Sequence, residues 1–89
     1  MTDDEYHAAQ QRARACKALM EDPAWVAAYE AVHAAVLADW SNAAWGVPEV
    51  REQKFAEMKG LQMVRDRMTG WINDAKFEFD RREKRVGAA

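Results

Sequence analysis

The chain has 89 residues, a formal net charge of −2 and 49% hydrophobic residues. This length allows a single domain, and so small a charge does not select a nucleic acid, a membrane or an acidic ligand as partner. The lone cysteine, Cys16, excludes an intramolecular disulfide and favours a reducing compartment. The acidic N-terminus differs from a signal peptide, and no apolar run approaches the ~20 residues of a membrane span. We therefore expect a soluble, cytoplasmic protein without membrane contact.

The first predicted helix covers residues 3–20. Thr2 is a suitable N-cap, and Glu5 stands three residues later, as in a capping box. The apolar residues of this segment are mostly small and recur at spacings of three and four, which predicts a narrow stripe that needs a neighbouring helix. They are Tyr6, Ala9, Ala13, Cys16 and Met20.

The second predicted helix covers residues 23–40. Asp22 is a suitable N-cap and Pro23 a suitable first helical residue, so we expect a break of one to three residues before this helix. Alanine fills most positions outside its apolar face and would permit close approach of another helix. The apolar face is broad and comprises Trp25, Val26, Tyr29, Val32, His33, Val36, Leu37 and Trp40.

A turn is predicted at residues 41–47, between two arms of similar length. Ser41 and Asn42 favour the end of a helix, and Gly46 relieves backbone constraint. Trp45 in this short connection either plugs the open end of the helix pair or faces a partner, and the plug is the favoured reading.

The third predicted helix covers residues 48–85 and begins at Pro48, with a frayed tail at 86–89. Gly60 and Gly70 weaken a helix but are expected not to interrupt it. Leu61, Met68 and Ala75 repeat at intervals of seven, as in a heptad. The expected apolar face contains Val50, Phe55, Met58, Leu61, Val64, Met68, Trp71, Ile72, Ala75 and Phe79.

These elements predict an all-α fold in which residues 1–89 form one antiparallel helical hairpin, with its first arm jointed at Pro23. A thin hairpin cannot cover all of its large apolar side chains, so we expect a homo-oligomer. The residues expected to hold the hairpin core and the subunit contacts are Trp25, Tyr29, Val36, Trp40, Trp45, Leu61, Met68, Trp71 and Ile72.

Charge is distributed unevenly along the chain. Residues 1–45 carry seven acidic and three basic residues, whereas residues 46–89 carry eight acidic and ten basic residues. The basic run near the C-terminus either contacts phosphate or a partner protein, or complements the negative end of a helix. It consists of Arg81, Arg82, Lys84 and Arg85.

No pattern of residues predicts a reaction. His7, His33 and Cys16 do not form a metal-binding spacing, and there is no glycine-rich phosphate loop. Glu30 and His33 match a Glu-x-x-His spacing only once, whereas helical-bundle metal sites repeat it. We expect a protein that is not an enzyme and has no metal, cofactor or small-molecule substrate.

One succession of features suggests a family. Leu19-Met20-Glu21-Asp22-Pro23, a helix ending at Trp40, and Arg51-Glu52 opening a long final helix resemble small helical proteins of tailed phages, prophages and gene transfer agents, encoded among DNA-packaging and head genes. Residues 19–80 also resemble the oligomerisation hairpin of small terminase subunits, which form rings that present viral DNA to the large terminase subunit.

The resemblance implies a ring-forming packaging adaptor in the host cytoplasm, with the large terminase subunit or another phage head protein as partner. No N-terminal helix-turn-helix is evident, which implies that any DNA contact is weak and non-specific, or that another protein makes it. Two alternatives stay open: a virion structural or head-completion protein, and a small regulatory protein that binds one partner through a helix face.

Overall fold

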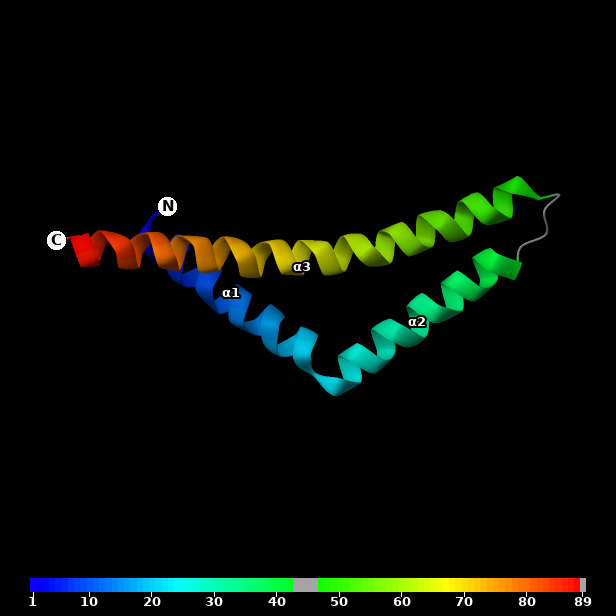
Figure 1. The fold of residues 1–89 in the computed structure, drawn as a ribbon, viewed down its shortest axis with the longest axis horizontal. Coiled ribbons are helices and arrows are strands. Elements are labelled where there is room, and N and C mark those ends of the chain that lie inside the picture. The colour runs from blue at the N-terminus through cyan, green and yellow to red at the C-terminus, as the bar shows by residue number, and fades with distance from the viewer. Residues whose placement is uncertain (43–46, 89) are drawn as a thin grey trace. The chain divides into compact units, whose positions relative to one another are not determined.

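The computed structural model describes residues 1–42 and 47–88, and within them the chain forms three helices and no strand. Helix α1 spans Asp3–Glu21, α2 spans Pro23–Asn42 and α3 spans Pro48–Ala88 (Figure 1). The prediction of an all-α chain with three helices is confirmed. None of these helices is both long enough and apolar enough to cross a membrane.

The first two helices begin where N-capping predicts. The Glu5 amide donates to Thr2 Oγ1 at 3.1 Å, which satisfies one of the unpaired amides of the first turn of α1. At α2 the amides of Ala24 and Trp25 both donate to Asp22 Oδ1, at 2.9 and 3.1 Å. The break between the helices is thus the single residue Asp22.

Helix α3 begins at Pro48 and continues without interruption to Ala88. Its first turn is closed by a hydrogen bond from the Val50 amide to the Val47 carbonyl at 3.2 Å. Gly60 and Gly70 both lie inside the helix, as expected. A Cβ atom added at either glycine would meet no atom within 4 Å, so neither is required by close packing within the chain.

All three helices end later than the sequence predicts. Helix α1 includes Glu21, α2 includes Ser41 and Asn42, and α3 passes the expected stop at Arg85. For α2 the reason is that Ser and Asn are poor helix formers but not helix breakers, so a last turn can include them at small cost. Of the predicted turn, residues 43–46 lie outside the described residues.

The chain divides into two compact units, each built from a short helix and part of α3. The first unit comprises Met1–Met20 and Asp66–Ala89, and the second comprises Glu21–Arg65. The boundary in the first arm falls next to Asp22, the residue that separates α1 from α2.

The first unit contains all four of the buried hydrophobic residues found in the described chain. Ala13, Cys16, Met68 and Ala75 are between 3% and 8% exposed. Three of the four are small, which lets α1 and α3 approach closely. The Gln10 side chain also joins the two helices, since its Nε2 donates to the Ala75 carbonyl at 2.8 Å.

The second unit has no buried residue among those described. Its two helices are antiparallel, because Asp39 pairs with Lys54 whereas Tyr29, ten residues earlier, contacts Arg65. Aromatic rings follow one another along α2: the ring centroids of Trp25 and Tyr29 lie 6.3 Å apart, as do those of Tyr29 and His33.

Candidate interaction surface

One set of positions along α3, at intervals of three and four, includes five residues that contact α1 or α2: Arg51, Lys54, Arg65, Ala75 and Arg82. This regular spacing is that of a coiled-coil face. We call these positions the α3 seam: Arg51, Lys54, Met58, Leu61, Arg65, Met68, Ile72, Ala75, Phe79 and Arg82. Four of the ten are basic: Arg51, Lys54, Arg65 and Arg82. The sequence placed none of these four on the packed face, and Arg82 was expected only as a phosphate or partner contact.

In the second unit, two of the seam arginines lie against aromatic rings of α2. The Arg51 guanidinium carbon is 4.7 Å from the centroid of the Trp40 ring, and that of Arg65 is 5.3 Å from the Tyr29 ring. Both distances are within the range of a cation–π interaction. The long side chains also cover apolar surface that a shorter residue would leave exposed.

Cation–π contacts also join the helices of the first unit. The Arg12 guanidinium of α1 lies 4.5 Å from the Trp71 ring, and that of Arg82 lies 3.8 Å from the Tyr6 ring. In addition, Arg82 Nη1 is 3.1 Å from Asp3 Oδ1. Arg82 is thus held by two residues from the first turn of α1.

Lys54 is the fourth basic residue of the seam. Its Nζ lies 3.3 Å from Glu57 Oε2 and 3.6 Å from Asp39 Oδ2. The hydrogen bond from Lys54 to Glu57 is the main cause that raises the pKa of Lys54, and the charges of Glu57 and Asp39 act in the same direction.

Eight of the nine residues predicted for the core and the subunit contacts are at least partly covered within the chain. Met68 is buried, and seven are half-buried: Trp25, Tyr29, Val36, Trp40, Leu61, Trp71 and Ile72. Trp45 lies outside the described residues. Whether any of them also forms a subunit contact stays a prediction.

Other residues of the predicted apolar faces stay exposed. On α3 these are Val50, Phe55, Val64 and Phe79, which are 40–54% exposed. The cause is geometric: a helix that packs against one neighbour covers a narrow stripe, whereas the apolar residues of α3 spread more widely.

The four basic residues predicted for phosphate contact differ in their surroundings. Arg82 contacts Asp3 and Tyr6, and Arg81 Nη1 lies 3.8 Å from Glu78 Oε1. Lys84 and Arg85 are exposed and form no ion pair with another residue that the structure describes. These two are therefore the best placed to meet a ligand.

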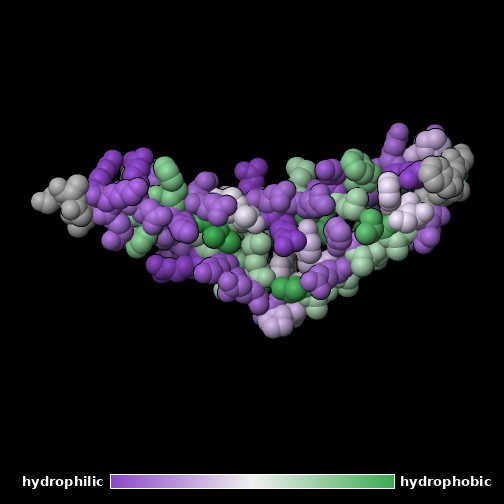
Figure 2. Space-filling model, in the orientation of Figure 1, coloured by the Kyte–Doolittle hydropathy of each residue, from purple (hydrophilic) through white to green (hydrophobic). Residues whose placement is uncertain are grey.

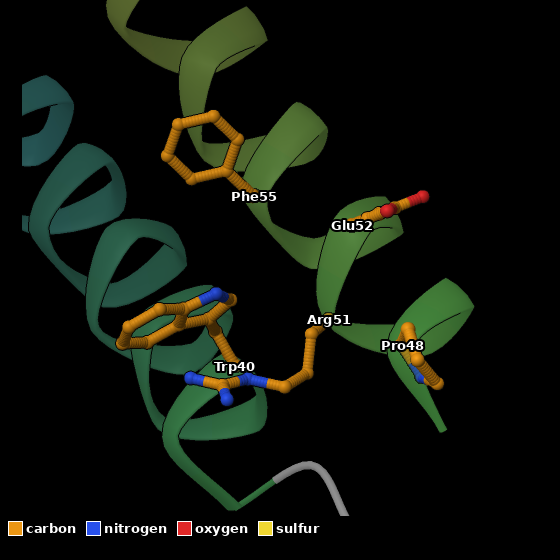
Figure 3. A pocket seen from close by; sticks show the side chains of 5 residues that line it. All are labelled: Trp40, Pro48, Arg51, Glu52 and Phe55. Atoms are coloured by element: carbon orange, nitrogen blue, oxygen red, sulfur yellow. The ribbon is translucent and has the colours of Figure 1, made fainter. Parts of the chain in front are cut away.

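An open pocket of about 380 Å³ lies in the second unit. Figure 3 shows Arg51 reaching from α3 toward the indole of Trp40 on α2, with Phe55 farther along α3. Pro48 and Glu52 complete the lining.

Helix α2 is rich in apolar residues, yet none of its 20 residues is buried. Val26, Val32 and Leu37 are 37–51% exposed. Figure 2 shows hydrophobic residues running along α2. The helix contains no lysine or arginine, and one of its two acidic residues, Asp39, is paired with Lys54.

Comparisons with known proteins give no relative. A scan against models of protein families finds no match, and comparison with curated proteins and with solved structures gives none either.

Among the residues that the structure describes, no three His, Cys, Asp or Glu side chains are grouped as metal ligands would be.

Proposed function

We propose that this chain is a non-enzymatic helical adaptor. It forms an antiparallel hairpin, assembles with copies of itself, and acts as a small-terminase-like component of phage-type DNA packaging. The general part of the proposal, self-assembly, rests on the surface of α2. The packaging role rests on the resemblance of residues 19–80 to small helical phage proteins.

The observation that carries the proposal is that the most apolar helix is also the least buried. A helix with apolar residues on all sides is normally covered by its surroundings. Among the described residues of the second unit, α2 contacts α3, and no residue of either helix in this unit is buried. A further protein surface would complete the burial.

DNA contact in this proposal belongs to the C-terminal cations. Lys84 and Arg85 are exposed at the end of α3, where basic residues also favour the negative end of the helix. The region is mixed in charge, since Asp80 and Glu83 lie among the basic residues. The contact would accordingly be weak, non-specific and sensitive to salt.

Self-assembly is tested by mass. Gel filtration with light scattering at several micromolar concentrations should give a multiple of 10.2 kDa. The double variant Val32→Ser, Leu37→Ser should shift the mass toward the monomer while circular dichroism stays helical. Phe77→Ser, on a residue that is 65% exposed in the first unit, is the matched control and should leave the mass unchanged.

A wild-type monomer throughout this concentration range would rule out self-assembly. The same exposed surface of α2 would then favour the regulatory alternative, in which a monomer forms a stoichiometric complex with one protein. The packaging role has its own test: a large terminase or portal gene beside this one would support it, and pull-down with that large terminase subunit should retain it.

A further inference from the structure

The first turn of α1 lies against Arg82, one of the four basic residues that the sequence predicts as phosphate contacts. Asp3 Oδ1 is 3.1 Å from Arg82 Nη1, and the Tyr6 ring lies 3.8 Å from the same guanidinium. Within this turn the Glu5 amide donates to Thr2 Oγ1, which caps the helix. Arg82 therefore has an anionic partner and an aromatic partner supplied by its own chain.

A carboxylate and a phosphate compete for the same guanidinium. Both are anions that accept charge-assisted hydrogen bonds from arginine, so Arg82 cannot bind a DNA phosphate fully while Asp3 holds it. Asp4 and Glu5 follow Asp3 in the same turn and add negative charge near the tail. An approaching phosphate meets this charge as well as the basic residues.

We infer that the N-terminal turn is an autoinhibitory contact, in which Asp3 and Tyr6 withhold Arg82 from DNA. The inference rests on the proposed DNA contact of the C-terminal cations and adds a control to it. The ion pair is solvent-exposed on the Asp3 side, where the side chain is 86% exposed, so the contact can be exchanged for another. Its release adds one cation to the DNA-binding surface.

The test compares two variants with the same charge. Asp3→Asn removes the ion pair, whereas Asp4→Asn changes the net charge equally in the same turn without a described contact to Arg82. Binding of a labelled random-sequence DNA duplex to the full chain is measured by fluorescence anisotropy between 50 and 200 mM salt.

The Asp3→Asn variant should bind more tightly than Asp4→Asn, with a salt slope steeper by about 0.9, the value for one additional neutralised phosphate. Across this fourfold change in salt, its advantage should therefore shrink about 3.5-fold. Arg82→Gln should have little effect in the wild type, where Arg82 is occupied, but should abolish the gain in the Asp3→Asn background.

Different failures have different meanings. Equal salt slopes for Asp3→Asn and Asp4→Asn would overturn the autoinhibitory contact. So would an Arg82→Gln substitution in the wild type that lowers DNA affinity as much as Lys84→Gln does. If neither the wild type nor any variant binds the duplex at 50 mM salt, the proposed DNA contact itself fails, and the inference fails with it. Circular dichroism of each variant checks that α1 remains folded.

Discussion

The packing of the first unit can be tested by making the same substitution, methionine to alanine, at two positions of α3, Met68 and Met63. Met68 is 7% exposed and belongs to the first unit, whereas Met63 is 69% exposed and belongs to the second. Truncating a buried methionine to alanine costs about 2–5 kcal/mol. We expect the lower end, about 2 kcal/mol, for Met68→Ala, because so few residues are buried around it that the site can collapse.

For a chain of this length, a loss of about 2 kcal/mol lowers the melting temperature by roughly 8–16 °C. Met63→Ala should change stability by less than about 0.5 kcal/mol. The assay is thermal and urea unfolding followed by circular dichroism, at two protein concentrations, because assembly makes the melting temperature depend on concentration. Equal losses for the two variants would refute the assignment of Met68 to the core.

Three further predictions concern the helices themselves. Asp22→Ala removes the N-cap of α2 and should cost about 1 kcal/mol in urea unfolding, whereas Asp22→Asn, an equally good cap, should cost little. Gly60→Ala and Gly70→Ala should each raise stability by up to ~1 kcal/mol, since an added Cβ meets no atom of the chain; a loss would show that another molecule packs there. A double-mutant cycle of Arg82→Gln with Tyr6→Leu should give a coupling of about 0.5–1 kcal/mol, and zero coupling would contradict the cation–π contact.

The starts of the helices could be predicted from the sequence because their causes are local. Thr2, Asp22 and Pro48 act on residues within one turn of themselves, and each helix begins beside them. The ends were less predictable. Ser41 and Asn42 permit either a stop or one more turn, and their own chemistry does not decide between them.

The contacts of α3 were only partly predictable. Leu61, Met68 and Ala75 were recognised because apolar residues at heptad spacing indicate a packed face. Arg51 and Arg65 were not, because a basic residue on a helix is usually solvated. A usable signal existed: both arginines continue the three-four spacing of the apolar seam, and α2 supplies the aromatic rings that they contact.

The candidate surface was least predictable, since it depends on what remains uncovered. The sequence indicated too many apolar residues for one hairpin, but Val26, Val32 and Leu37 could not be separated from the rest of their face. Packing against α3 half-buries Trp25, Tyr29, His33, Val36 and Trp40 and leaves those three exposed.

The confinement of the buried residues to the first unit has a consequence for hydrogen exchange. Amides open locally with free energies that reflect the packing around them, so the two units should not exchange at the same rate. Along α3, amides after Asp66 should exchange slowly at any protein concentration. Those between Pro48 and Arg65, like those of α2, should exchange quickly in dilute solution, and the proposed self-assembly predicts that they slow down as the protein concentration rises.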